Sequence, residues 1–484
     1  MKHIGKSYDK VDAKGILSGK PSYTGDFVPK DALIIKVLRS PHAQAKIKSI
    51  DTSKAKLIPG VEAIFTYEDV PNTRFTLAGQ TYPEPSAYDA LILDPVVRYV
   101  GDEVALVVAK DEATALKAMP LIKVEYEVQK PVLDLRTAMD HETVVHPEDD
   151  ILNHIPVGQD YKRNICVSYH KRVGDIEAEL AKCDYVVEGT YFDQATRQSA
   201  MEPFQSFGYI DHLGRIVIVS STQIVFHVRR HIARALGIPA SKIRVIKPRI
   251  GGGFGSKQTA CTELMTAFVT WKLQKPCYLL YDRTEAQTCS TTRHAREWYI
   301  RVGATKDGII QVIDMDSITD AGAHATHCFT TTTAGEHKSV PLYNKAKAVH
   351  YGTEGVYMNH TPGGAFRGYG ATEALWPLEC AVNRLADEMG IDPAELRQKN
   401  LIAAGERSLV YDPDEIMDSG LFQETVNKVK EMAHWDERPH SWDIDERYRG
   451  GLGMALALQG SGVANIDVAS VEIRLGDDGN YTLY

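Results

Sequence analysis

The sequence predicts an α+β protein that is built from two regions. Short runs of apolar and β-branched residues, typical of strands, alternate with segments that have the period of amphipathic helices. A stretch near residue 140 that is rich in proline, histidine and acidic residues interrupts this pattern. The chain has 484 residues, enough for more than one domain and a large core. We therefore place a small α/β unit at residues 1–135, a linker at 136–165, and a larger unit of mixed sheets with helices at 166–484.

Four strands and one helix are expected in the first region. Apolar composition or alternation marks the strands, in "ALIIKVLRS" (Ala32–Ser40), "GVEAIFTYEDV" (Gly60–Val70), the run Val104–Ala109, and "LIKVEYEV" with one solvated face. The helix begins at Asp111. It should end or kink near Met119, because Pro120 cannot donate the next backbone hydrogen bond.

The segment from Lys130 to about Gly158 shows no sustained period, and we interpret it as a linker over the surface. Strands are then predicted at Cys183–Asp193, Ser206–Asp211, Gly214–Thr222 and in "KIRVIKPRI". A helix from about Val225 to Leu236 precedes the last of these, and Gly237 is suited to its C-terminal cap.

Two helices and a hairpin are expected further on. Gly390 would close the first helix, and Asp392 with Pro393 and Glu395 would start the second. Val471–Leu475, a turn near Asp478-Gly479 and a strand from Tyr481 read as the hairpin. Because the chain stops at Tyr484 within or at the end of that second strand, we expect another chain to continue the sheet.

Composition argues against several classes of protein. The formal net charge is −9 and the pI is about 6.0, which disfavours a nucleic-acid-binding surface. No run of 18 apolar residues is present, so no membrane span is expected, and the N-terminus has no signal-peptide core. Seven scattered cysteines without a Cys-x-x-Cys pair predict reduced thiols in the cytoplasm and no iron–sulfur cluster held by this chain.

The stretch "RVIKPRIGGGFGSKQ" carries four glycines around Phe254, which need a reason because each glycine costs backbone entropy. A dinucleotide fingerprint fails because Ser256 occupies its third glycine position, and a P-loop fails because Gln258 follows Lys257. The earlier "GILSGKPS" fails as a P-loop as well. The alternative is a tight strand-to-helix turn that binds no ligand.

Two further segments favour a site over a plain turn. "SSTQI" (Ser220–Ile224) follows a strand, and "TPGGAFRGYGATEA" (Thr361–Ala374) is a second glycine-rich loop with an aromatic residue and an arginine. Loops of this kind can direct backbone N–H groups at an anionic, oxygen-rich ligand.

These three motifs, in this order and spacing, resemble the molybdenum-cofactor subunit of the xanthine dehydrogenase family of molybdenum hydroxylases. "RSPHAQAKI", "PGVEAIFTYEDVP" and "YVGDEVALVVA" are similar to the small hammerhead-type α/β domain at the N-terminus of that subunit. The resemblance covers nearly the whole chain and is strongest to bacterial multi-subunit xanthine dehydrogenases. It implies the first part of the molybdopterin-binding domain after the hammerhead domain, whether the subunit is naturally split or truncated.

The resemblance implies roles for individual residues. Gln223 would hydrogen-bond the molybdenum centre, which has a terminal sulfido or selenido ligand, and Phe254 and Arg367 would lie beside it. The remaining cofactor-binding residues would be Gly252, Gly253, Gly255, Ala365 and Phe366. Gln258 and Tyr369, with Phe254, would face the substrate; related animal enzymes have a glutamate at the first position and a phenylalanine at the second.

The implied reaction is hydroxylation of a purine such as xanthine or hypoxanthine, with water as the oxygen source. The cofactor would be molybdopterin, in its cytosine dinucleotide form, and a glutamate base would come from a second molybdopterin-subunit chain. Electrons would pass to a [2Fe–2S] subunit and an FAD subunit. Alternatives are dehydrogenation of nicotinate or another N-heterocycle, aldehyde oxidation, and a non-catalytic scaffold homologue. Carbon monoxide dehydrogenation is disfavoured, because that branch has a copper-binding cysteine where this chain has Gly368.

Two other candidates have simpler interpretations. "HATHC" (His324–Cys328) has metal-like spacing, but a zinc site needs three or four ligands and the sequence shows no distant partner. We therefore expect loop histidines there. Glu202 in "SAMEPF" could act as a general base; in the family this glutamate belongs to the scaffold, and we assign it no chemistry.

Overall fold

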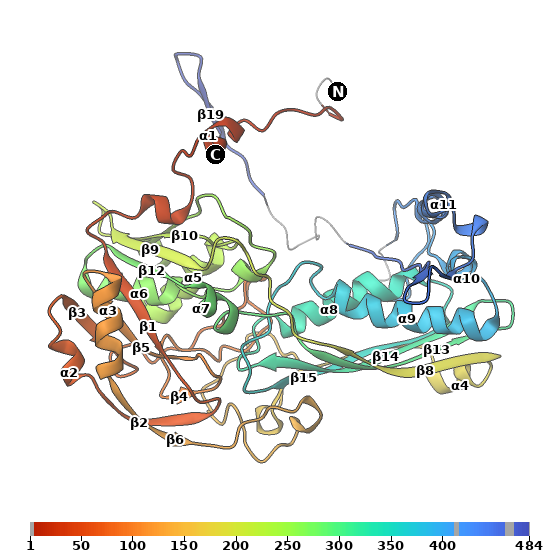
Figure 1. The fold of residues 1–484 in the computed structure, drawn as a ribbon, viewed down its shortest axis with the longest axis horizontal. Coiled ribbons are helices and arrows are strands. Elements are labelled where there is room, and N and C mark those ends of the chain that lie inside the picture. Colours follow the sequence, from red (N-terminus) through yellow and green to blue (C-terminus); the bar gives the residue numbers. More distant parts are fainter. Residues whose placement is uncertain (1–3, 411–415, 460–468, 484) are drawn as a thin grey trace.

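The computed structural model describes residues 4–410, 416–459 and 469–483, and two large sheets organise most of them (Figure 1). The first sheet has seven strands in the order β11 (Ile243–Ile246), β10 (Ile216–Ser220), β9 (Gln205–Ile210), β12 (Cys277–Leu280), β1 (Leu33–Arg39), β5 (Glu103–Ala109) and β3 (Val61–Phe65). The second has five strands in the order β7 (Ile165–Val173), β15 (Ala348–Tyr357), β14 (Ile310–Gly322), β13 (Arg296–Ala304) and β8 (Tyr185–Asp193).

The remaining described strands form three small sheets. One joins β4 (Val96–Val97), β2 (Ala45–Asp51) and β6 (Lys123–Val128), and the others are hairpins of β16 (Ser441–Asp443) with β17 (Arg449–Gly451) and of β18 (Ile473–Leu475) with β19 (Tyr481–Leu483). The helices of the first 290 residues are α1 (Ala13–Leu17), α2 (Ser53–Lys56), α3 (Glu112–Ala118), α4 (Ile176–Leu180), α5 (Val225–Leu236), α6 (Glu263–Leu273) and α7 (Arg283–Thr288). The later helices are α8 (Cys328–Ser339), α9 (Ala371–Met389), α10 (Pro393–Asn400) and α11 (Phe422–Ala433).

The seven-stranded sheet joins strands from both sides of the predicted linker. β1 pairs with β12 in parallel, with Leu33 opposite Cys277, and with β5 in antiparallel. Helices α5 and α6 pack on the later strands, and eight consecutive residues of α6, 263–270, are buried. The core between them includes Ile35, Ile218 and Phe268. The predicted division at residue 135 therefore does not coincide with the edge of a sheet, and the division itself stays a prediction.

The five-stranded sheet has helices α8 and α9 on one face (Figure 1). Alternate residues of its strands point toward them, and Trp298, Ile300 and Tyr351 form the second large core with Leu378 and Leu385 of α9. The other face carries mostly polar residues and is partly covered by α4.

Elements that were predicted from signals within their own residues are confirmed. Helix α5 spans Val225–Leu236 and ends at Gly237, which has a φ of +64°. Asp111 caps α3 by accepting from the Thr114 N–H, Asp392 caps α10, and the predicted hairpin is β18–β19.

The predicted linker is more than a surface connection. Ala138, Val145, His146 and Asn164 are fully or almost fully buried, and Asn164 Nδ2 donates to the carbonyls of Ala138 and Thr143. A segment without a regular hydrophobic period can still be buried when its side chains form hydrogen bonds with its backbone N–H and C=O groups. In the described part of the chain, no helix is long and apolar enough to cross a bilayer.

Candidate active site

The first two predicted loops leave the same edge of the seven-stranded sheet. β10 and β11 are neighbouring parallel strands, so the segments that follow them, with Gln223 and Phe254, emerge side by side. The Gly255 N–H donates to Gln223 Oε1 at 3.1 Å, and the Gln223 N–H donates to the Lys257 carbonyl at 2.8 Å.

The third loop, between β15 and α9, packs against the glycine loop and forms a hydrogen bond with it. The Arg367 N–H donates to the Phe254 carbonyl at 2.9 Å. Gly255 has a φ of +95°, and a Cβ there would lie 2.7 Å from the Ala365 oxygen. At Gly253 a Cβ would lie 2.5 Å from Gln223 Oε1. Gly255 is therefore required by its backbone conformation and by the close approach of the third loop, while a side chain at Gly253 would displace Gln223.

The joined loops present unused hydrogen-bond donors. Within the described residues, the backbone N–H groups of Gly252, Gly253, Phe254 and Phe366 donate to no other part of the chain. Because the Gly255 N–H fixes the oxygen of the Gln223 amide, the Nε2 group of that amide is directed away as a donor. The side chains of Gln223, Phe254 and Arg367 are exposed, so these donors line an open surface suited to an oxygen-rich anion.

Glu202 supports this surface from behind. Its Oε2 accepts from the Gly251 N–H (2.7 Å), Ser221 Oγ (2.6 Å) and the buried Lys257 Nζ (3.0 Å), while its Oε1 accepts from Gln205. The carboxylate is fully engaged in joining the ends of β10 and β11. These contacts fit the scaffold role that we expected for it and leave no oxygen free to act as a base.

His327 contacts both Tyr369 and Gln258, two of the residues predicted to face the substrate. Its Nδ1 lies 2.9 Å from the Tyr369 hydroxyl, and its Nε2 lies 3.2 Å from the Gln258 carbonyl. Burial lowers the pKa of His327 to about 4, so the ring is neutral at physiological pH. The Gln258 side chain reaches the first region, where its Oε1 accepts from Gln80 Nε2 at 3.2 Å.

Sequence reasoning did not assign His327, Gln80 or Arg293 to the site. The guanidinium of Arg293 lies 4.4 Å from the centre of the Phe366 ring and donates to the Arg367 carbonyl at 2.7 Å. The "HATHC" spacing did draw attention to His327, but as a possible metal ligand. Its role as a contact between two loops was not predicted. Gln80 and Arg293 had no local signal, because their partners lie far away in the sequence.

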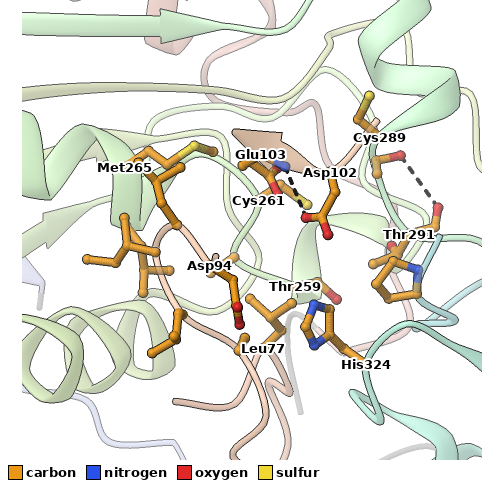
Figure 2. Close-up of a pocket in the computed structure, with 18 of the residues that line it drawn as sticks. Leu77, Asp94, Asp102, Glu103, Thr259, Cys261, Met265, Cys289, Thr291 and His324 are labelled. Carbon is orange, nitrogen blue, oxygen red and sulfur yellow. Dashed lines mark hydrogen bonds between the residues drawn. The ribbon is translucent and has the colours of Figure 1, made fainter. Parts of the chain in front are cut away.

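A cavity lies elsewhere, and its lining includes none of Gln223, Phe254 and Arg367 (Figure 2). It has a volume of about 70 Å³ and is lined by residues such as Leu77, Asp102, Thr259, Met265 and His324. Burial and the neighbouring Glu103 raise the pKa of Asp102 to about 7. Sites for molecules of drug size measure roughly 300 Å³ or more, so a pterin cofactor would not fit here. The open surface of the three loops is the better place for it.

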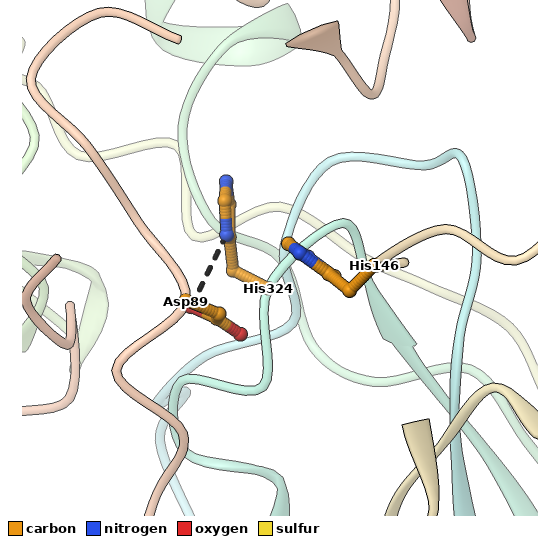
Figure 3. Close-up of side chains that lie close together, drawn as sticks. All are labelled: Asp89, His146 and His324. Atoms are coloured by element: carbon orange, nitrogen blue, oxygen red, sulfur yellow. Dashed lines mark hydrogen bonds and ion pairs between the residues drawn. The ribbon is translucent and has the colours of Figure 1, made fainter. Parts of the chain in front are cut away.

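His324 has two distant neighbours that the sequence could not show, Asp89 and His146 (Figure 3). Asp89 Oδ1 lies 3.2 Å from His324 Nδ1, while Asp89 Oδ2 accepts from the Ala325 N–H and the Tyr357 hydroxyl. His146 Nε2 lies 2.7 Å from the Ala323 carbonyl and its Nδ1 lies 3.3 Å from Glu148. Both Asp89 oxygens, His324 Nδ1 and His146 Nε2 have these contacts, so we interpret the group as a buried polar network that joins the two regions.

Comparison with known protein families matches two successive segments. Residues 18–130 match the a/b hammerhead domain of aldehyde oxidase and xanthine dehydrogenase, and residues 157–401 match the molybdopterin cofactor-binding domain.

Individual relatives agree with these matches. A probable hypoxanthine oxidase, XdhD, of Escherichia coli is 34% identical over 99% of this chain and 53% of its own length. The nicotinate dehydrogenase large molybdopterin subunit of Eubacterium barkeri is 30% identical over 89% of this chain and 96% of its own length. The structure of an aldehyde oxidoreductase from Desulfovibrio desulfuricans superposes with a TM-score of 0.85 at 25% identity, over 99% of this chain and 52% of that one.

The chain spans about half the length of several of these relatives, and the matched segments are the ones that build the three-loop surface. The predicted fold class, a hammerhead domain followed by molybdopterin-binding structure of mixed sheets and helices, is confirmed. The chain belongs to the family of molybdopterin-binding oxidoreductases that includes the aldehyde oxidases and xanthine dehydrogenases.

Proposed function

We propose that this chain is the molybdenum-cofactor part of an enzyme that hydroxylates a purine such as xanthine or hypoxanthine, with oxygen from water. The observation that carries the proposal is the three-loop surface, where unused N–H donors lie beside the linked residues Gln258 and Tyr369. The 34% identity to a probable hypoxanthine oxidase supports a purine as the substrate.

The residues present fit a molybdopterin cofactor, which would supply the oxidising centre when bound. Gln223 Nε2 and the N–H groups of Gly252 and Gly253 would donate to its oxygen atoms, and Phe254 and Arg367 would border it. Gly255, Ala365 and Phe366 would hold the two glycine loops together around it. The three-loop surface has no Cys or His cluster in the described chain, which suits a metal that is held by the pterin itself. We propose the cytosine dinucleotide form and a terminal sulfido or selenido ligand.

Gln258 and Tyr369 would orient the substrate. With its Oε1 accepting from Gln80, the Gln258 amide presents Nε2 as a donor to a carbonyl or ring nitrogen of a heterocycle. The hydroxyl of Tyr369 is held by Thr330 at 2.6 Å and by His327, which fixes the ring in place for stacking.

We further propose that partner chains complete the enzyme in the cytoplasm. A second molybdopterin-subunit chain would supply the glutamate base, and electrons would leave through a [2Fe–2S] subunit and an FAD subunit. The hairpin β18–β19 supports a partner, because Ile473, Leu475, Tyr481 and Leu483 are each at least 64% exposed. An isolated two-stranded hairpin is marginal in water, so these apolar residues favour pairing with another chain. The seven cysteines are free, as in a reducing compartment.

Nicotinate is the second candidate substrate. The large molybdopterin subunit of nicotinate dehydrogenase aligns over 96% of its own length, more than the other relatives described above. An aldehyde is the third candidate, because the fold is shared with aldehyde oxidoreductases.

The test is purification of the native complex through a tag on this chain. We expect molybdenum by elemental analysis, iron and FAD on co-purifying subunits, and turnover of xanthine or hypoxanthine. Turnover of nicotinate or of an aldehyde alone would replace the purine assignment. A complex without molybdenum would contradict an enzymatic function and favour a scaffold homologue.

A further inference from the structure

Two histidines face each other on the sheet surface that is turned away from α8 and α9. His170 of β7 lies opposite Gly352 of β15, and His350 precedes Gly352 by two residues, so both side chains point to the same face. Asp314 and Asp316 of β14 share this face, because Asp314 lies opposite His350. The neighbouring odd-numbered residues, such as Tyr351, point into the core with α9.

Each histidine has one ring nitrogen fixed by a carboxylate. His350 Nδ1 lies 2.8 Å from Asp314 Oδ1, and His170 Nε2 lies 3.0 Å from Glu354 Oε1. The other oxygen of this carboxylate, Asp314 Oδ2, accepts from Arg301 Nε at 2.7 Å, so Asp314 is paired with a guanidinium and acts as an acceptor. Both rings therefore direct their N–H outward to these two carboxylates.

The remaining nitrogens, His170 Nδ1 and His350 Nε2, lie 3.1 Å apart. With both outer nitrogens protonated, these inner nitrogens carry lone pairs that face each other and repel. A positive species between them removes the repulsion, either one shared proton or a metal ion. Histidines that bind a metal almost always donate their other N–H to a carboxylate or carbonyl, which is the arrangement of this pair.

A third ligand and the necessary space are also present. Asp316 Oδ1 lies 4.0 Å from His170 Nδ1, and the three ligand atoms lie within 4.8 Å of one another. Two nitrogens bound to one tetrahedral Zn²⁺ at about 2.0–2.1 Å would be roughly 3.3 Å apart, close to the spacing of the two rings. A Cβ on Gly352 would lie 2.3 Å from His170 Nδ1 and 2.8 Å from His350 Nε2, so glycine keeps the space between the rings open.

We propose that His170, His350 and Asp316 bind a divalent transition-metal ion such as Zn²⁺, with water in the fourth position. The rings are now nearly coplanar, with planes 10° apart, so one must tilt to converge on an ion. His170 can do so because its side chain is 31% exposed, whereas that of His350 is 5% exposed. The ion would fasten strands β7, β14 and β15 together, independently of the molybdenum chemistry.

The experiment is a Zn²⁺ titration of the EDTA-treated native complex by calorimetry, repeated with Co²⁺, whose visible difference absorption reports tetrahedral coordination. We expect one ion per chain. The variants His170→Ala and Asp316→Asn should each weaken binding at least ten-fold, and Glu354→Gln should weaken it about ten-fold through the orientation of His170. His212→Ala is the matched control, because His212 is exposed in a turn far from this cluster in the sequence.

A raised thermal midpoint with Zn²⁺ in the wild type, absent in His170→Ala, would add support, because an ion that binds only the folded state stabilises it. If the wild type takes up no ion, or if His170→Ala and Asp316→Asn bind it as tightly as the wild type does, the pair holds a shared proton and the metal site is wrong. Circular dichroism of each variant separates loss of the site from loss of the fold.

Discussion

The oxygen and the nitrogen of the Gln223 side-chain amide have different roles. Its oxygen is held by the Gly255 N–H, and its Nε2 group is left as a donor on an exposed surface. If Gln223 only held the loop in place, its amide oxygen would be sufficient for that role. The free half of the amide is the feature that favours a contact with the cofactor.

Replacement of Gln223 by alanine tests that contact. We expect Gln223→Ala to leave the complex assembled and to lower kcat by about one or two powers of ten, the cost of losing one oriented donor at a charged centre. Steady-state turnover with molybdenum content is the measurement, and Gln423→Ala, on exposed helix α11, is the control. Unchanged turnover would refute the assignment of Gln223.

Gln258 should discriminate between substrates. A buried amide left without its partner costs ~1–3 kcal/mol, so its removal should hurt the substrate that it contacts more than an analogue without the matching group. The measurement is kcat/KM of Gln258→Ala for xanthine and hypoxanthine, with molybdenum content checked in the same preparation. Equal losses with the metal retained would mean that Gln258 supports the loop. No loss for either substrate would place its side chain outside the site.

His327 gives the stability of the chain a dependence on pH. Its pKa is about 4 in the folded chain and near 6.5 in an unfolded one, so the unfolded state takes up a proton first as the pH falls. The stabilisation from the neutral buried ring is present above pH 6.5 and is lost as the pH falls toward 4. Between pH 7 and pH 5 this one group removes about 2 kcal/mol.

Urea unfolding of the wild type and His327→Gln at pH 7 and pH 5 measures this effect. The amide of glutamine can still donate to the Gln258 carbonyl but does not titrate, so the variant should lose less stability over this interval. An equal loss in both proteins would show that His327 is not held neutral.

Among the elements, those with signals inside their own sequence were predictable. The boundaries of α5 follow from its apolar period and Gly237, and those of α10 follow from Asp392 and Pro393. Pairing between distant segments was not predictable, as with β1 and β12 or the link from Gln80 to Gln258. The same limit applies to His324, whose partners Asp89 and His146 come from segments with no signal of their own.

The contact between the two glycine loops can be tested at Gly255. Gly255→Ala would bring its Cβ within 2.7 Å of the Ala365 oxygen and would also strain a backbone with a φ of +95°. We expect loss of molybdenum and a thermal midpoint several degrees lower. Gly405→Ala carries similar strain at a φ of +87° but meets no atom within 4 Å, so it isolates the contribution of the loop contact. Equal behaviour of the two variants would show that the contact is dispensable.

At the scale of the whole molecule, the hairpin β18–β19 stands apart from the two large sheets (Figure 1). Expressed alone, the chain should be poorly soluble and bind no molybdenum. Hydrogen exchange should be fast at the amides of β18 and β19 in the isolated chain and slow in the native complex, because a partner strand would protect them. A soluble chain that is active alone, or a hairpin that exchanges fast in the complex, would contradict the proposed pairing.

The seven-stranded sheet also sets the order in which the chain can fold during synthesis. Strand β1 has no parallel neighbour until β12 has left the ribosome, because Leu33 pairs with Cys277. Until then one edge of β1 lies bare, and such edges are prone to pair with the wrong chain. Pairings of such long sequence separation also form slowly. A nascent chain cut before β12 would thus be a natural client for chaperones, although its hammerhead segment is complete.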